Sequence, residues 1–283
     1  MVKLEDRYFY VKRVTRLPKK GVVLMRIAVI ACKVLLRELY YLSWNSPHIV
    51  EIWPMKQGLH NEPDNLRCKL QAMVDTIEAD EDICDAICLG YGLCSNGVAG
   101  IFSQKAPVVI PRGHDCITLL LGSKERYREL FDSHSGVYWY APGWIEQSHQ
   151  PGKERYELLY QQYVEKYGED NAEYLMDMEQ NWMKIYNWAI HIDWQEFDNR
   201  ENIRYTQECA EFLNWQCKVV PGESALLRDM LHGEWKDPER FLIVPPGQVI
   251  SPSYDEYVVK AVPKGTRLEL RDAPSVYRYL RQK

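Results

Sequence analysis

Three cysteines of this chain stand where a buried, strand-like run turns into a helix. Cys32 ends the run RIAVIAC, Cys94 closes LGYGLC, and Cys116 follows IPRGHD. In an open parallel sheet, ligands bind beyond the carboxyl ends of the strands, and the first turn of a helix offers unpaired N–H groups that stabilise a thiolate. We therefore expect reactive or metal-binding thiols at these three positions.

The strand order decides whether the three thiols meet. In a flavodoxin-like order 2-1-3-4-5, the strands that lead to Cys32, Cys94 and Cys116 are neighbours, spaced about 4.8 Å apart. Three thiolates without a fourth cysteine suit an iron–sulfur cluster with one open iron, or a zinc ion with one open position. His114 is a candidate fourth ligand. In the alternative, Asp115 caps the helix and His114 binds substrate as a catalytic residue.

Further side chains are assigned to the same crevice. We expect Tyr91 and Arg112, which flank the cysteines, to bind substrate. At the mouth of a later strand-like run, YWYAPGWIE, Trp144 would form a wall and Glu146 would donate or accept a proton. The alternative for Trp144 and Glu146 is an ordinary turn.

Glu179 interrupts an apolar helical face between Met176 and Met183. A carboxylate on an apolar face is costly unless it is paired. Glu179 is therefore either a hydrogen-bonded catalytic candidate or a residue at the solvated edge of that face.

The remaining cysteines lie within strands or helices and fit small core residues. They are Cys68, Cys84, Cys88, Cys209 and Cys217. The sequence contains no CxxC pair, Walker lysine, HExxH or GxSxG motif, and Ser95 stands where a dinucleotide fingerprint needs its third glycine. We expect reduced thiols in a cytoplasmic protein.

Alternating strands and helices predict an α/β fold with doubly wound, mostly parallel sheets. The run VVPGESALLRDMLHG at 219–233 echoes VIPRGHDCITLLLG at 109–122, which predicts two related Rossmann-like halves facing a cleft. The expected parts are an N-terminal extension at 1–24, an α/β domain with the cysteines at 25–150, a helical insertion with a second α/β half at 151–250, and a tail at 251–283.

Charge and hydropathy limit the kinds of partner. The formal net charge of −5 at pH 7 argues against a general nucleic-acid surface, and no apolar run is long enough to cross a bilayer. Many of the 19 tyrosines and 9 tryptophans fall between Tyr138 and Trp215. They suit aromatic core packing, a wide pocket or a partner surface.

Several runs carry a resemblance to a known family. They are IACKVLLREL, LGYGLCSNG, IPRGHDCITLLLGSKERY, YWYAPGWIE, PGESALLRDMLHGEW and FLIVPPG. Over about Met25 to Ile250 the chain resembles the family catalogued as domain of unknown function 1638. The resemblance implies a protein of methanogens and other anaerobes, often encoded near corrinoid proteins and their methyltransferases, and hence a role in one-carbon metabolism. It supplies no catalytic residues.

The residues and the resemblance leave two functions open. One is an enzyme or redox protein whose cysteines hold an iron–sulfur cluster or zinc that activates a small-molecule substrate. The other is a non-catalytic accessory protein that binds a corrinoid protein or delivers a metal, with the aromatic second half as the docking surface.

Overall fold

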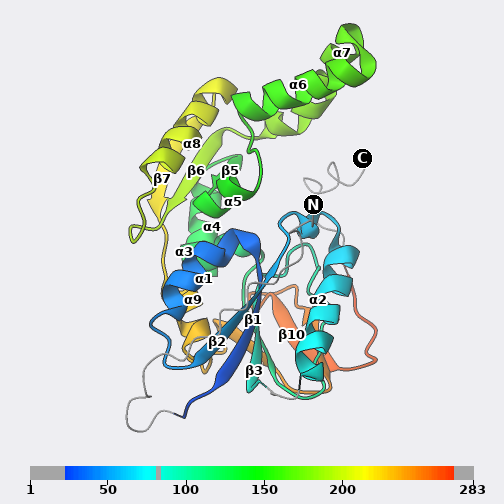
Figure 1. Cartoon of the computed structure of the whole chain (residues 1–283), viewed down its shortest axis with the longest axis vertical. Helices are drawn as coiled ribbons and strands as arrows, with labels where there is room; N and C mark the ends of the chain where they lie inside the picture. The colour runs from blue at the N-terminus through cyan, green and yellow to red at the C-terminus, as the bar shows by residue number, and fades with distance from the viewer. Residues whose placement is uncertain (1–22, 81–83, 271–283) are drawn as a thin grey trace, which may run out of the picture. The chain divides into compact units, whose positions relative to one another are not determined.

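The computed structural model describes residues 23–80 and 84–270, and these form two compact units. The first unit runs up to Lys124 and resumes at Glu223, and the second is the intervening stretch Glu125–Gly222. Figure 1 labels the helices and strands of both. The expected N-terminal extension, 1–24, lies almost wholly outside the described residues.

The first unit is built on a five-stranded, mostly parallel sheet with the order β2-β1-β3-β4-β8. The first four strands are parallel, and β8 runs antiparallel to β4. β3 and β4 are buried along their whole length, and so is nearly all of β1, which explains their continuous apolar sequences. The strands are β1 (Arg26–Cys32), β2 (Ile49–Met55), β3 (Ala86–Gly90), β4 (Val108–Pro111) and β8 (Phe241–Val244). The expected order is thus confirmed for strands 2-1-3-4.

The strand-like run at Gly136 to Tyr140, which the order 2-1-3-4-5 would place fifth in this sheet, belongs to the other unit. β5 (Val137–Tyr140) pairs with β6 (Trp188–Asp193), and the place beside β4 is taken by β8. An apolar run shows that a strand is buried but does not show which strand it pairs with, so the sequence placed β5 wrongly. The boundaries between the units consequently follow Lys124 and Gly222, rather than the expected residues 150 and 250.

Helices cover both faces of the five-stranded sheet. The helix α2 lies on one face, while α1 and α9 pack together on the other (Figure 1). The apolar residues of α2 recur at helical spacing and are buried against the sheet. The helical segments of this unit are η1 (Lys33–Leu35), α1 (Leu36–Ser43), η2 (Leu59–Asn61), α2 (Pro63–Ala79), α3 (Cys116–Leu121) and α9 (Ala225–Leu231).

A β-hairpin completes the first unit. β9 (Gln248–Pro252) and β10 (Val259–Pro263) pair antiparallel and pack beside β8. The buried side chain of Arg112 joins this hairpin to the sheet, because its Nη1 donates to the carbonyls of Tyr257 and Val259. The expected tail, 251–283, therefore begins inside an integral part of the unit.

The second unit has its own three-stranded parallel sheet, in the order β5-β6-β7. Its buried core contains Tyr140, Ala189, Cys209 and Ala210, with Tyr138, Tyr205 and Trp215 packed against them. The other elements are α4 (Lys124–Ser133), α5 (Pro142–Gln147), α6 (Lys153–Tyr167), α7 (Glu169–Gln180), η3 (Asn181–Ile185), α8 (Arg200–Leu213) and β7 (Gln216–Pro221). Several aromatic side chains of this unit therefore belong to its core or pack against it. That the units are related halves facing a cleft stays a prediction.

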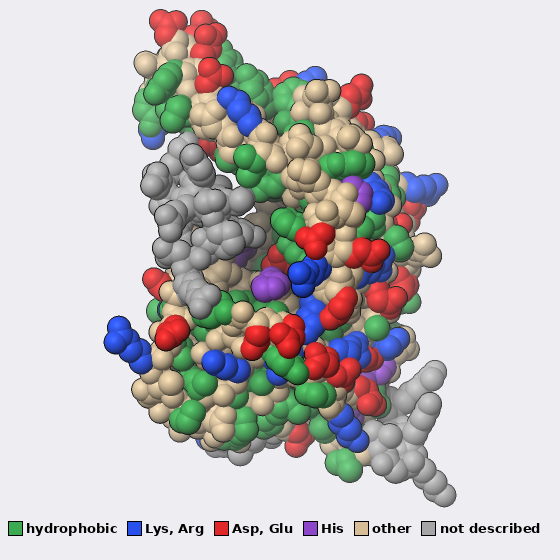
Figure 2. Space-filling view, turned by 180° about the vertical axis from the view of Figure 1, so that it is seen from behind, with side chains coloured by type: hydrophobic (Ala, Val, Ile, Leu, Met, Phe, Trp, Pro, Cys, Tyr) green, Lys and Arg blue, Asp and Glu red, His purple; other side chains and the backbone are tan. Residues whose placement is uncertain are grey.

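The surface of the described chain is rich in charges of both signs. Acidic and basic side chains are intermixed over much of the face in Figure 2, and exposed acidic residues of α7 gather at one end. No helix of the described residues is long and apolar enough to span a membrane.

The loops after β3 and β4 pack directly against each other. The backbone N–H groups of Leu93 and Cys94 donate to the carbonyls of Gly113 and His114, each at 2.8 Å. A Cβ on Gly92 would lie 2.4 Å from the backbone nitrogen of Asp115. Glycine at this position therefore allows the two loops to approach.

Replacing Gly92 tests this packing. We expect Gly92→Ala to lower the free energy of unfolding of the first unit by about 3 kcal/mol or more, because backbone must move to admit the methyl group. The matched control is Gly58→Ala, where a Cβ meets nothing within 4 Å and only the φ of 86° opposes it; we expect a loss of about 1 kcal/mol. Chemical denaturation measures both, and equal losses would contradict the close approach.

Candidate functional site

The carboxyl ends of β1, β3 and β4 bring Cys32, Cys94 and Cys116 together. The thiol of Cys116 is hydrogen-bonded to the thiols of both Cys32 and Cys94. Cys32 is 5% exposed, Cys94 is 6% exposed and Cys116 is 8% exposed, and none of the three forms a disulfide. We call these residues the three-cysteine site. Their meeting follows from the strand order, whereas their role as metal ligands stays a prediction.

Two of the thiols stand at the beginning of a helical segment. Cys32 is the last residue of β1 and the N-cap of η1, and the backbone N–H of Val34 contributes to the lowered pKa of its thiol. Cys116 is the first residue of α3, whose N-cap is Asp115. The Asp115 carboxylate accepts from the N–H groups of Ile117 and Thr118, at 3.0 and 3.3 Å. The capping role considered for Asp115 is thus confirmed.

The third thiol is carried by a turn with an unusual backbone. Cys94, Ser95 and Asn96 all have positive φ angles, of 46°, 55° and 69°. Side chains in this left-handed region cost about 1–2 kcal/mol each relative to ordinary conformations. Such a turn persists only where its surroundings enforce it. The hydrogen bond from Cys94 N–H to the carbonyl of His114 is one such contact.

The hydrogen bond between Cys32 and Cys116 shifts the pKa values of the two thiols in opposite directions. The Cys116 S–H group donates to Cys32 and thereby lowers the pKa of Cys32; the N–H of Val34 lowers it further, while burial opposes both. The hydrogen bonds to Cys32 and Cys94, together with burial, raise the pKa of Cys116 well above its ordinary value. The hydrogen bond therefore favours the negative charge on Cys32 and the proton on Cys116.

Tyr91 lies beside these sulfurs. Its side chain is 2% exposed, and its hydroxyl has no hydrogen-bond partner among the described residues. Burial, followed by the electrostatic influence of the nearby cysteine sulfurs, raises the pKa of Tyr91 well above its ordinary value. Tyr91 is consequently a neutral O–H donor that finds no acceptor within the described part of the chain.

The side chains of His114 and Arg112 have other surroundings than the three thiols. The His114 side chain is exposed. Its pKa is lowered, first by the partial desolvation of the imidazole and then by the charge of Lys124. The guanidinium of Arg112 is committed to main-chain carbonyls of Pro238, Tyr257 and Val259. Within residues 23–80 and 84–270, no group of three or more His, Cys, Asp or Glu side chains is arranged to hold a metal ion. The thiols would have to turn to form a coordination sphere.

Three other expected site residues belong to the second unit. Trp144 is half-buried and Glu146 is exposed, both on α5. Glu179 accepts a hydrogen bond from Arg155 Nη2 at 2.7 Å, with the two side chains 15% and 21% exposed. Of the two alternatives for Glu179, the structure shows the paired carboxylate. The catalytic roles of all three residues stay predictions.

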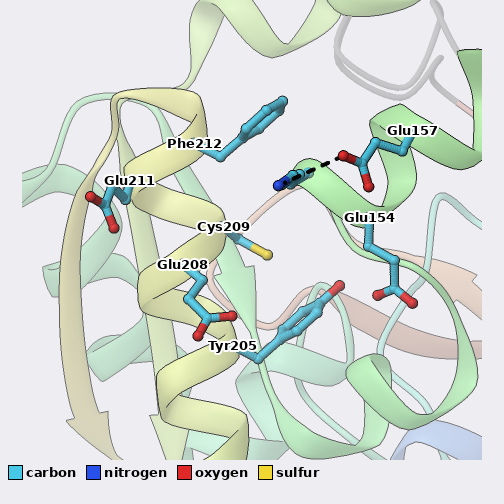
Figure 3. Close-up of a pocket in the computed structure, with 8 residues that line it drawn as sticks. Glu154, Glu157, Tyr205, Glu208, Cys209, Glu211 and Phe212 are labelled. Carbon is cyan, nitrogen blue, oxygen red and sulfur yellow. Dashed lines mark ion pairs between the residues drawn. The ribbon is translucent and has the colours of Figure 1, made fainter.

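Sequence reasoning missed a hollow of about 600 Å³ between α6 and α8 of the second unit (Figure 3). The thiol of Cys209 is hydrogen-bonded to Tyr205 and Tyr140, and burial raises its pKa to about 11. Lys153 pairs with Glu157 at 3.8 Å. The lining residues are Lys153, Glu154, Glu157, Tyr205, Glu208, Cys209, Glu211 and Phe212. This arrangement fits a solvated acidic groove with a protonated thiol at its base.

The Tyr91 hydroxyl, which has no partner among the described residues, predicts an unusual effect on the free energy of unfolding. In metal-free protein, we expect Tyr91→Phe to raise the free energy of unfolding by about 1 kcal/mol, because a buried hydroxyl without a partner is removed. Tyr140→Phe should instead lower it by a similar amount, since the Tyr140 hydroxyl donates to Pro151 O at 2.7 Å. Denaturation curves of the two variants measure the signs. A destabilised Tyr91→Phe protein would show that the hydroxyl has a partner.

The hydrogen bond from Cys116 predicts how the alkylation rate of Cys32 depends on pH. In reduced, metal-free protein, the midpoint for alkylation of Cys32 by iodoacetamide should lie below that of an ordinary thiol. Cys116→Ala removes the S–H donor, so the midpoint should move to higher pH, whereas the control Cys84→Ala should leave it in place. Peptide mass mapping across a pH series gives the rates. An unmoved midpoint in Cys116→Ala would refute the thiol–thiolate pair.

Comparison with known proteins gives one family. Curated proteins and solved structures yield no match to this chain. The family model described as "Protein of unknown function (DUF1638)" matches residues 54–231, more than half of the chain. The match includes Tyr91, Cys94, Cys116 and the second unit, while Cys32 precedes it. The chain belongs to the DUF1638 family.

Proposed function

We propose that the protein binds a metal centre through the thiolates of Cys32, Cys94 and Cys116. The observation that carries this proposal is the Cys116 thiol, which is hydrogen-bonded to the other two thiols at the carboxyl edge of one parallel sheet. Three sulfur ligands favour a soft or borderline metal, so the centre is an iron–sulfur cluster with an open iron or a zinc ion with an open position.

The local chemistry supports metal binding in a second way. Metal ligands must be deprotonated, and metal binding releases their protons. Cys32 already has a lowered pKa, and the proton that it shares with Cys116 is the one that a metal ion would displace. The positive ends of η1 and α3 add to the stabilisation of the thiolates. Coordination then requires the side chains to turn, without a change in strand order.

The proposed setting is anaerobic one-carbon metabolism in the cytoplasm, linked to corrinoid-dependent methyl transfer. A small-molecule substrate would occupy the open position of the metal. His114 would act as the fourth ligand or as a proton carrier, and Glu146 and Glu179 are the further catalytic candidates. Its macromolecular partner would be a corrinoid protein or a methyltransferase.

Metal analysis of cysteine variants tests this function. Protein made without oxygen should carry about one metal centre per chain. Cys32→Ser, Cys94→Ser and Cys116→Ser should each lower its occupancy sharply, since a whole structural zinc site is worth roughly 10 kcal/mol or more. The matched controls Cys84→Ser and Cys217→Ser should keep the metal, with a stability loss of at most about 1–3 kcal/mol.

The opposite result would select the second candidate. If folded wild-type protein retains no stoichiometric metal after anaerobic reconstitution with iron and sulfide or with zinc, the metal-centred function is wrong. The protein would then be a non-catalytic accessory protein that binds a corrinoid protein.

One observation favours that second candidate. The helix α6 buries none of its residues and α7 buries only Ala172 and Met176. Large apolar side chains are exposed on the same two helices, namely Leu158, Tyr167, Tyr174 and Met178. Because exposed apolar residues that gather on one element are typical of a docking surface, α6 and α7 are where a protein partner would bind in this case.

A further inference from the structure

We propose that one face of α7 binds a basic segment of another protein that also carries apolar side chains. The face consists of Glu173, Tyr174, Asp177 and Met178, and we call it the outer α7 face. This inference goes beyond the metal function and does not depend on it. It also narrows the exposed surface of α6 and α7 to one face and assigns a charge to its partner.

The contact with α6 determines which face of α7 points outward. Ala172 and Met176 are buried, and Glu179 accepts a hydrogen bond from Arg155 of α6 at 2.7 Å. These residues therefore form the packed face of α7. The outer α7 face has the spacing i, i+1, i+4 and i+5, which places its four side chains together on the other side of the helix.

Two large apolar side chains of the outer α7 face are exposed. Tyr174 is 66% exposed, and Met178, one turn later, is 51% exposed. Tyrosine and methionine are enriched in protein interfaces, and the flexible thioether of methionine adapts to varied partners. Acidic and hydrophobic side chains lie next to one another on this helix (Figure 2). A bound segment with apolar side chains would remove this apolar surface from water.

The charges on the outer α7 face specify the partner. The helix α7 contains no lysine or arginine, and neither Glu173 nor Asp177 forms an ion pair within the part of the chain that the structure describes. Asp177 also lies in the last turn of α7, where the negative end of the helix dipole disfavours a carboxylate. Lysine or arginine side chains of a partner would contact both carboxylates and offset that cost.

The hollow between α6 and α8 is a second acidic surface of the same unit, but its charges are better compensated. Glu157 pairs with Lys153, and Glu208 pairs with Arg204, each at 3.8 Å. These pairs leave less negative charge for an external cation than the outer α7 face does. The hollow therefore provides the control site for the experiment.

Calorimetric titration with a model peptide tests the inference. The probe is a short amphipathic helical peptide of leucine and lysine, and the control peptide carries glutamate in place of every lysine. We expect the double variant Glu173→Gln, Asp177→Asn to bind the lysine peptide about 10-fold more weakly than wild type at low salt, because two charge contacts are lost. The matched variant Glu208→Gln, Glu211→Gln has the same net charge and should bind like wild type. Circular dichroism checks that both variants are folded.

A second pair of variants tests the apolar contribution. Tyr174→Ala combined with Met178→Ala should weaken binding of the lysine peptide about 10-fold or more at low and at high salt, because burial of apolar area is not screened by ions. The control Phe131→Ala alters a side chain of α4 that is 50% exposed and should bind like wild type.

Each other outcome overturns the inference. Equal affinity of wild type for the two peptides would refute a basic partner, and so would wild type that binds neither peptide. Unchanged affinity in either α7 double variant would refute the outer α7 face. Weaker binding only in Glu208→Gln, Glu211→Gln would place the peptide in the hollow instead. Because metal content is measured separately, all of these results leave the proposed metal function in place.

Discussion

The proton on Cys116 links the parts of the first unit that come from three strands. Its thiol is hydrogen-bonded to Cys32 at the end of β1 and to Cys94 in the turn after β3, and the bond to Cys32 lowers the pKa of that thiol, which burial alone would raise. This bond depends on three buried parallel strands in the order β1-β3-β4, and on Gly92, which lets the two carrier loops touch. The three-cysteine site thus depends on the strand order and on glycine at position 92.

Much of this arrangement could be predicted from sequence because it obeys local rules. Continuous apolar runs identify buried strands, and the position of Cys32 or Cys116 just before an amphipathic or Leu-rich run places it at a helix start. The alternation of strands and helices predicts parallel strands, and parallel strands have the carboxyl ends of β1, β3 and β4 at one edge. Asp115 as an N-cap is a similar local signal, since its side chain needs only the N–H groups of the next turn.

The remainder depends on contacts between distant residues. Nothing in the run FLIV shows that β8 would pair antiparallel with β4 and displace β5 into another sheet. Arg112 resembles a ligand-binding residue in sequence, but its partners are carbonyls more than a hundred residues later. That the Tyr91 hydroxyl has no partner among the described residues is evident only from the positions of those residues in the fold. The sequence leaves a paired and a solvent-edge position open for Glu179, and it does not identify Arg155 as the partner.

X-ray absorption spectroscopy of protein isolated without oxygen tests the three-sulfur metal site, because it counts the atoms bound to the metal. We expect three protein sulfurs among the atoms bound to the metal, at about 2.3 Å if the metal is zinc. We also expect Cys94→Ser, which alters the strained turn after β3, to remove one of these sulfurs from whatever metal remains bound. A metal bound only by nitrogen and oxygen, or one that keeps all its sulfurs in Cys94→Ser, would contradict the three-sulfur site.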